Sequence, residues 1–132
     1  MTVLLAYVST PEGDAALAVA VQEAELRSTD AVVVNITRPE AAIDSPFSAE
    51  QTLDAVAERF ASVGLKAQIR QLPPTADVAQ AILDAAADTD AEVLVIGLRR
   101  RSAVGKFVLG STSQRILLGA DCPVIAVKAD LD

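Results

Sequence analysis

The sequence predicts one α/β domain built on a five-stranded parallel sheet with helices on both faces. Two observations lead to this prediction. Short apolar runs alternate along all 132 residues with longer segments whose apolar residues recur at helical spacing. Four of the five short runs are apolar without interruption, as strands covered on both faces are. A strict strand–helix alternation then implies parallel strands joined by right-handed crossovers.

The strands differ in pattern between the sheet centre and its edge. The uninterrupted apolar runs cover residues 3–8, 31–34, 93–96 and 124–127, and Asn35 and Ile36 extend the second of them. In the remaining run apolar residues alternate with polar ones: Leu65, Lys66, Ala67, Gln68, Ile69 and Arg70. Alternation leaves one face in water, which is typical of a strand at a sheet edge.

Capping residues mark the start of the first and third predicted helices. Thr10 is the expected N-cap of the first helix, with Pro11 at its first position, and this helix would run to about Arg27. The third helix follows residues 74–75. Its predicted core face is Val78, Ala79, Ile82, Leu83 and Ala86.

The second and fourth helices each show a capping-box spacing. Ser48 and Gln51 form the box of the second helix, which Gly64 would end. Its predicted core face is Leu53, Val56, Ala57, Phe60 and Ala61. Ser111 and Gln114 form the box of the fourth helix, expected to end near residue 119.

Composition excludes several classes of function. A net charge of −7 and a pI near 4.5 disfavour nucleic acid and anionic lipid as partners. The absence of histidine excludes Ser-His-Asp triads and histidine-ligated metals. Asp88, Asp90 and Glu92 are better explained as a solvated turn than as a metal site, and we expect no metal centre.

The cysteine content and the N-terminus predict a cytoplasmic protein. Cys122 is the single cysteine, so no internal disulfide forms, and we expect it to be a small buried hydrophobe rather than a nucleophile. Residues 1–5 carry no basic leader region, and no apolar run reaches the roughly 20 residues of a membrane span.

One segment, residues 97–113, combines features of an anion site. Gly97 is expected directly after the fourth strand, where a ligand can approach without meeting a Cβ. Gly110 precedes the fourth helix, whose first N–H groups are unpaired, and Ser111, Thr112 and Ser113 add hydroxyls. Residues 99–101 are three arginines. The alternative is that these are ordinary turn and cap residues of a connection.

The same segment resembles the C-terminal signature of universal stress proteins. Nucleotide-binding members carry a glycine, two residues, a second glycine, nine residues and then Gly-Ser or Gly-Thr. Gly97 matches the first glycine, and residues 101–109 are the nine that precede Gly110 and Ser111. Residues 113–117 and 121–127 resemble the helix and last strand that follow. Weaker similarity extends over the whole chain.

The resemblance implies an adenine nucleotide, such as ATP with an accompanying Mg²⁺, at the ends of strands one and four. Its phosphates would lie on Gly97, Arg99, Arg100, Gly110, Ser111, Thr112 and Ser113. Its base would lie among Ala6, Tyr7, Val8, Ile36 and Ile96, with Ile36 against the ring.

Two positions depart from the family pattern. Arg100 replaces the second glycine, and it either obstructs the phosphates or contributes a charge-assisted contact to them. Val8 stands where nucleotide-binding members have an aspartate that accepts hydrogen bonds from adenine.

The resemblance also implies a fold and a partner. The fold is the adenine-nucleotide α-hydrolase-like three-layer fold, with strand order 3-2-1-4-5. That order places the last strand at an edge, and its apolar residues 124–127 (Val124, Ile125, Ala126 and Val127) predict a homodimer formed by edge pairing. The alternative is that the fourth helix and the tail cover this edge.

Three functions remain open from the sequence. The first is a stress-response protein whose bound nucleotide modulates binding to an unidentified partner protein, with at most slow ATP hydrolysis because no candidate base is present. The second is a dimeric signalling protein of the same fold that binds no nucleotide, which Val8 and Arg100 favour. The third is an adenylyl-transferring enzyme, which the absence of a Ser-Gly-Gly phosphate loop disfavours.

Overall fold

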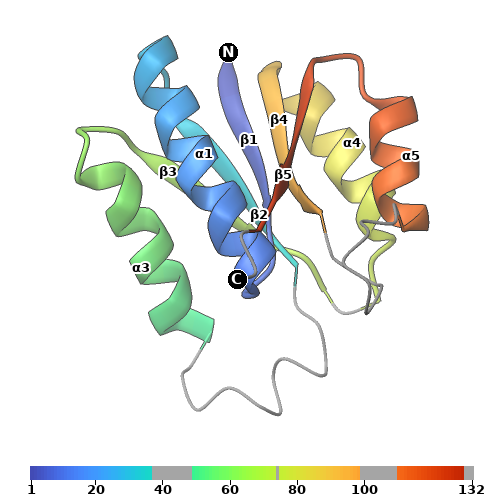
Figure 1. Ribbon diagram of the computed structural model, residues 1–132, viewed down its shortest axis with the longest axis horizontal. Coiled ribbons are helices and arrows are strands. Elements are labelled where there is room, and N and C mark those ends of the chain that lie inside the picture. The colour runs from blue at the N-terminus through green and yellow to red at the C-terminus, as the bar shows by residue number, and fades with distance from the viewer. Residues whose placement is uncertain (37–48, 74, 99–109, 130–132) are drawn as a thin grey trace.

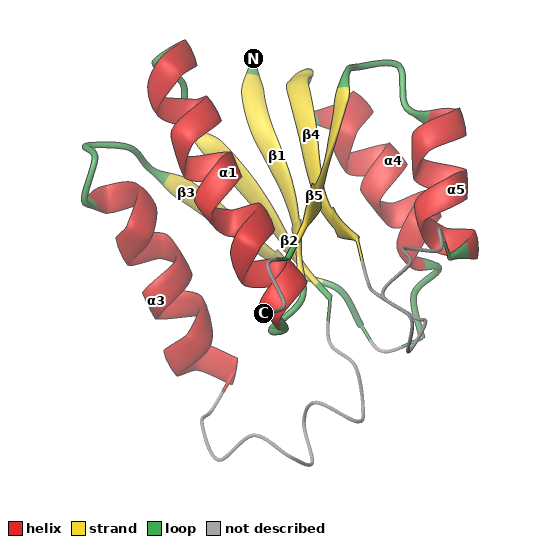
Figure 2. Cartoon of the chain, in the orientation of Figure 1, coloured by secondary structure: helices red, strands yellow, loops and turns green. Residues whose placement is uncertain are grey.

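The computed structural model describes residues 1–36, 49–73, 75–98 and 110–129. Within these ranges strands and helices alternate along the chain (Figures 1 and 2). The strands are β1 (Thr2–Tyr7), β2 (Ala31–Asn35), β3 (Ala67–Gln71), β4 (Ala91–Leu98) and β5 (Val124–Lys128). The helices are α1 (Pro11–Arg27), α3 (Ala49–Ala61), α4 (Val78–Asp88) and α5 (Ser111–Gly119).

All five strands are parallel and lie in the order β3-β2-β1-β4-β5, which confirms the predicted fold and strand order. Figure 1 shows α1 and α3 on one face of the sheet and α4 and α5 on the other. At the sheet centre, Leu4 pairs with Val32 on one side and with Leu94 on the other. The carboxyl ends of β1 and β4 therefore lie side by side, where this fold class binds ligands.

The central strands bury both faces, and alternate residues belong to different cores. On β1, Val3, Leu5 and Tyr7 pack with α1 and α3, whereas Leu4 and Ala6 pack with α4 and α5. The core on the α1 side also buries Val56 and Phe60 of α3, as predicted, although Ala61 is exposed. This alternation decides which residues at the strand ends can share a site.

Helix α1 begins as the sequence predicts. Thr10 is its N-cap, Pro11 occupies its first position, and the Thr10 hydroxyl accepts a hydrogen bond from Gly13 N at 3.0 Å. At its other end Ser28 adopts the left-handed conformation (φ 53°) and donates its N–H to carbonyls of the last turn.

The capping-box prediction for α5 is wrong. Gly110 is the N-cap, Ser111 is the first helical residue, and no side chain caps the helix. Gln114 instead donates its backbone N–H to the Gly110 carbonyl at 3.0 Å. A capping box needs its serine at the N-cap, but Gly110 occupies that position and Ser111 comes one residue later. The corresponding prediction at Ser48 lies outside the described residues.

The two edge strands differ as predicted. On β3 the polar side chains point outward, and Arg70 forms an ion pair with Asp88 at 3.0 Å. On β5, Val124, Ile125 and Val127 are half-buried and Ala126 is exposed, so this edge keeps an apolar character. Whether a second subunit covers β5 stays a prediction.

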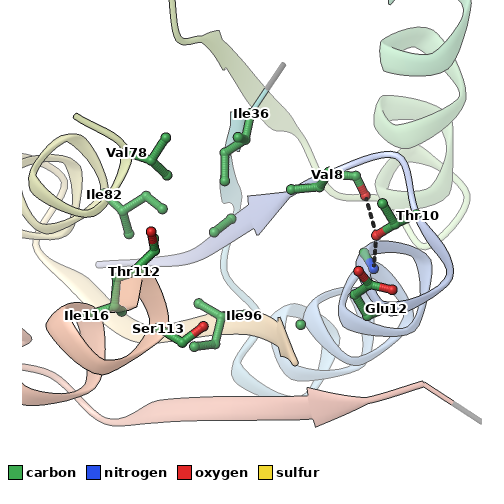
Figure 3. A pocket seen from close by; sticks show the side chains of 13 residues that line it. Val8, Thr10, Glu12, Ile36, Val78, Ile82, Ile96, Thr112, Ser113 and Ile116 are labelled. Atoms are coloured by element: carbon green, nitrogen blue, oxygen red, sulfur yellow. Dashed lines mark hydrogen bonds between the residues drawn. The ribbon is translucent and has the colours of Figure 1, made fainter. Parts of the chain in front are cut away.

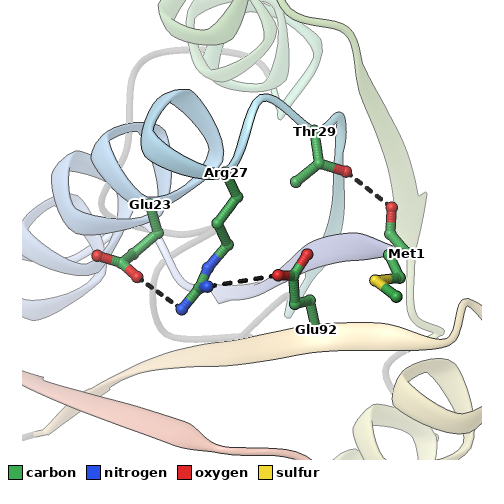
Figure 4. A network of polar contacts seen from close by, with 5 residues as sticks. All are labelled: Met1, Glu23, Arg27, Thr29 and Glu92. Atoms are coloured by element: carbon green, nitrogen blue, oxygen red, sulfur yellow. Dashed lines mark hydrogen bonds and ion pairs between the residues drawn. The ribbon is translucent and has the colours of Figure 1, made fainter.

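A polar network closes the amino ends of the strands (Figure 4). Arg27, in the last turn of α1, pairs with Glu23 at 3.0 Å and with Glu92 of β4 at 3.5 Å. Thr29 donates its hydroxyl to the Met1 carbonyl at 2.7 Å. These contacts fix the end of α1 to the sheet, far from the carboxyl ends of the strands. Glu92 thus belongs to β4 and pairs with Arg27, so the predicted solvated turn does not include it.

Candidate functional site

A cavity of about 230 Å³ lies at the carboxyl ends of β1 and β4. That volume is several times the roughly 30 Å³ of one water molecule, so the cavity has room for an organic group. Three elements enclose it besides the strands: the first turn of α1, the start of α4 and the start of α5 (Figure 3). It is lined by Ala6, Val8, Thr10, Glu12, Gly13, Ile36, Val78, Ile82, Ile96, Gly97, Thr112, Ser113 and Ile116.

Strand alternation brings four of the five predicted base-pocket residues to this cavity. Ala6 and Ile96 belong to the core on the α4 side of the sheet, and Ile36 packs against it. Val8, two residues after Ala6, follows the same alternation and lines the cavity as well. Together with Val78 and Ile82 of α4 they form an apolar wall (Figure 3). A planar apolar ring is the kind of group that such a wall accommodates.

Tyr7, the fifth predicted base-pocket residue, lies on the opposite face of the sheet. Its side chain is buried in the α1 core, and its hydroxyl donates to Asp14 Oδ1 at 2.8 Å. Burial, with the Asp14 carboxylate beside it, raises the pKa of Tyr7 to about 12. The backbone of Tyr7 lies at the strand end beside the cavity, where its carbonyl accepts a hydrogen bond from the Ile36 N–H at 2.8 Å. Tyr7 instead lines a second cavity, between α1 and α3.

Two glycines allow α1 to approach the strand ends. A Cβ on Gly13 would lie 1.7 Å from the Val8 carbonyl oxygen, and one on Gly97 would lie 2.5 Å from the Glu12 carbonyl oxygen. Gly97 was predicted to come directly after the fourth strand. It instead lies inside β4, in register with Val127. Its missing side chain makes room for the first turn of α1. The absence of a Cβ at Gly13 likewise lets the first turn of α1 lie close to the Val8 carbonyl.

The start of α5 borders the cavity, and no described side chain caps it. Gly110 has no side chain to cap the helix, so the first N–H groups of α5 have no capping partner within the described residues. Thr112 and Ser113 add hydroxyls to the cavity wall. By contrast, side chains cap the other helices whose starts are described: Thr10 caps α1 and Asp77 caps α4. An uncapped helix start carries partial positive charge and favours an anion.

Contacts with α4 hold α5 in this position. Arg115 donates to both carboxylate oxygens of Asp77, at 2.9 and 3.2 Å, and the Asp77 carboxylate also caps α4 by accepting from Gln80 N. The hydrogen bond from Arg115 lowers the pKa of Asp77. Near the other end of α5, a Cβ on Gly119 would lie 2.8 Å from Leu83 Cδ1 of α4, so the two helices pack closely.

The α1 side of the cavity offers one free polar group. The Thr10 hydroxyl is engaged, because it accepts from Gly13 N and contacts the Val8 carbonyl at 3.4 Å. The carboxylate of Glu12 has no hydrogen bond or ion pair with any described residue. The described lining of the cavity therefore has three parts: an apolar wall, the start of α5 with its hydroxyls, and the carboxylate of Glu12.

Sequence reasoning missed the contribution of α1 and α4 to this site. Gly13, three residues after the Thr10 cap, was an available signal, since glycine inside a helix costs stability and implies a close approach. Val78 and Ile82 were expected only as core residues, and Ile116 only as part of the helix that resembles the family's signature. Of the predicted phosphate contacts, Arg99 and Arg100 lie outside the described residues, and Ser111 is at the helix start but does not line the cavity.

The described residues give no indication of a metal site or of a reactive thiol. They contain no group of three acidic or cysteine side chains arranged to bind a metal ion. Cys122 is half-buried against the core on the α4 side, and burial raises the pKa of its thiol. None of the helices in the described part of the chain has the length and apolar character needed to cross a bilayer.

Comparison with known proteins gives one consistent result. Residues 1–128 match the model of the universal stress protein family. A universal stress protein of Mycolicibacterium smegmatis is 38% identical over 126 residues, covering 96% of each chain. A universal stress protein structure from Archaeoglobus fulgidus has a TM-score of 0.78 at 28% identity, covering 97% of this chain and 98% of that one. A structure of an Archaeoglobus fulgidus universal stress protein in complex with dAMP has a TM-score of 0.72 at 26% identity, with the same coverage.

Proposed function

The chain belongs to the universal stress protein family, and on that premise we propose that it binds an adenine nucleotide in the cavity at the ends of β1 and β4. The base lies against the apolar wall, and the phosphate lies on the start of α5. The nucleotide state then modulates the binding of a partner protein. The dAMP complex of the relative from Archaeoglobus fulgidus supports this class of ligand.

The uncapped start of α5 beside an apolar cavity is the observation that carries the proposal. Each free N–H there can donate to a phosphate oxygen, and the Thr112 and Ser113 hydroxyls can donate as well. Arg115 is the only cationic side chain in α5, a helix that lies wholly within the described residues, and it is already paired with Asp77. Phosphate binding therefore depends on the helix start itself, together with any contact from the segment 99–109.

The base would be held by shape and apolar contact. Ile36 and Ile82 lie on the wall, and Val8 occupies the strand end without offering an acceptor. A valine cannot accept a hydrogen bond from the adenine amino group, so selectivity for adenine over other purines should be weak.

Calorimetric titration with AMP and with ATP, each with and without Mg²⁺, tests the proposal. The key variant is Ser113→Glu, which adds a carboxylate at the start of α5. A unit charge about 5 Å from a phosphate charge costs on the order of 3 kcal/mol at an effective dielectric constant of 20, so affinity should fall at least tenfold. The same carboxylate favours the helix by about 0.3–1 kcal/mol, so the fold should be retained.

Gln22→Glu is the matched control, because it adds the same charge on the exposed middle of α1. The proposal expects wild-type affinity from this variant. Equal weakening in both variants would mean that net charge, rather than the start of α5, governs binding.

A dimeric protein that binds no nucleotide is the second candidate, and Val8 favours it. It predicts no heat with millimolar AMP or ATP in any of these titrations. In that case the cavity would be a consequence of the fold rather than a ligand site.

The homodimer proposed from the sequence is supported by the edge position and the half-buried apolar side chains of β5. Sedimentation velocity over a hundredfold range of concentration tests it. A species of about twice the 13.7 kDa chain mass is expected. A monomer at every concentration would rule the homodimer out.

A further inference from the structure

Glu12 is the one cavity-lining residue among those described that carries an ionisable side chain. It lies in the first turn of α1, and its backbone is pressed against Gly97 of β4. A Cβ built on Gly97 would lie 3.3 Å from the Glu12 Cβ, so the Glu12 side chain starts directly above the end of β4. Glu12 as a residue is half-buried, and its carboxylate has no partner among the described residues.

Among the described residues that line this side of the cavity, no other side chain is free to accept a hydrogen bond from a ligand. Val8 is apolar, Gly13 and Gly97 have no side chains, and the Thr10 hydroxyl is engaged with Gly13 N. Figure 3 shows Thr10 and Glu12 on one side of the cavity and Thr112 and Ser113 on the other. A ligand that spans the cavity therefore meets donors at α5 and an acceptor at α1.

We infer that the Glu12 carboxylate accepts hydrogen bonds from the sugar hydroxyls of the bound nucleotide and makes the site prefer nucleotides that carry these hydroxyls. The inference rests on the proposed function. A carboxylate repels the phosphate, so the phosphate stays at α5, and the apolar wall takes the base. The neutral, donor-rich part of the nucleotide that remains is the sugar. Two adjacent hydroxyls suit the two oxygens of a carboxylate, and acidic side chains recognise ribose in this way in dinucleotide-binding folds.

The test compares AMP with 2′,3′-dideoxy-AMP, which has the same base and phosphate but lacks both hydroxyls. Calorimetric dissociation constants are measured for the wild type and for Glu12→Gln. The wild type should prefer AMP by roughly tenfold or more, as expected for a hydrogen bond to a charged group. In Glu12→Gln the preference should fall to about threefold or less, because an amide oxygen is a weaker acceptor.

The decisive quantity is the ratio of the affinities for AMP and dideoxy-AMP. Removing the negative charge of Glu12 also changes the attraction for phosphate, but it does so equally for both nucleotides. Glu25→Gln is the matched control, since it removes a charge from an exposed position near the other end of α1. It should keep the wild-type ratio.

The possible failures are distinguishable. If the wild type binds AMP and dideoxy-AMP equally well, or if Glu12→Gln keeps the full preference, nucleotide binding stands and the role of Glu12 is refuted. If neither nucleotide binds to the wild type, the proposed function fails and the inference fails with it.

Discussion

Replacing Gly97 by alanine tests how closely α1 is fitted to the end of β4. The new Cβ would lie 2.5 Å from the Glu12 carbonyl oxygen and 2.8 Å from the Glu12 carbonyl carbon. Both atoms are backbone, so relief requires the first turn of α1 to move. Overpacking of this kind costs about 1–3 kcal/mol. Alanine recovers about 0.5–1 kcal/mol, because glycine is the more flexible residue in the unfolded chain. The middles of these two ranges give an expected net loss of about 1–1.5 kcal/mol.

Urea unfolding followed by circular dichroism measures this loss. With a slope near 2 kcal/mol per molar urea, the midpoint should fall by about 0.5–0.75 M at an unchanged slope. Gly119→Ala is the matched control. Its Cβ would lie 2.8 Å from Leu83 Cδ1, but that methyl group ends a flexible side chain. Because alanine also favours the helix, this variant should stay within about 0.5 kcal/mol of the wild type.

Wild-type stability in Gly97→Ala would contradict a close contact between the first turn of α1 and β4. Equal destabilisation by both variants would contradict the expected difference between Gly97 and Gly119. It would show that a side-chain methyl yields no more easily than a carbonyl group does.

Three further predictions concern stability and titration. Ser28→Gly should raise the free energy of unfolding by about 0.5–1 kcal/mol in thermal unfolding, because Ser28 has a φ of 53°, and a loss of stability would contradict this. Arg115 lowers the pKa of Asp77, so the stabilisation is present at neutral pH and is lost as pH falls through that lowered pKa. The stability advantage of the wild type over Asp77→Asn should therefore shrink below about pH 4, and a gap that is independent of pH would exclude the ion pair as its source. Tyr7 is the only tyrosine and there is no tryptophan, so its phenolate absorbance should appear with a midpoint of about 12 in the folded protein. Because this pKa is raised, the stability that it contributes is complete below pH 10 and is lost toward pH 12. Asp14→Asn should lower the midpoint while leaving it above the ordinary value, because burial is the larger cause, and an unchanged midpoint would contradict the contribution of Asp14.

The fold was predictable because local and global signals agree in this chain. Apolar runs mark β1, β2 and β4, which are buried on both faces, and Thr10-Pro11 marks the start of α1. The apolar run at β5 also marks a strand, but this strand is only half-buried because it lies at a sheet edge. The alternating pattern of β3 correctly indicated an edge. The Ser111 capping box failed because a glycine can occupy an N-cap without making any side-chain bond, so the pattern of polar residues was read one position late.

The candidate site was predictable only in part. Residues at strand ends, such as Val8 and Ile36, follow from the rule that parallel sheets bind ligands at their carboxyl edge. The Tyr7 side chain lies on the opposite face, because a strand sends neighbouring side chains to opposite faces, so only the backbone of Tyr7 can take part in the predicted base pocket. Glu12 and Ile82 come from helices whose approach to the cavity depends on tertiary packing, in particular on the contact at Gly97. Such contacts leave no periodic signal in a single sequence.

The position of the bound nucleotide is the most direct test of the account. An AMP titration followed in ¹H–¹⁵N correlation spectra would report on the backbone N–H groups of the whole chain. We expect the largest shifts at Ser111, Thr112 and Ser113, with smaller ones at Val8 and Ile36. Shifts centred on Asp14 and Arg59, which line the second cavity between α1 and α3, would contradict the account, as would spectra that do not change at millimolar AMP.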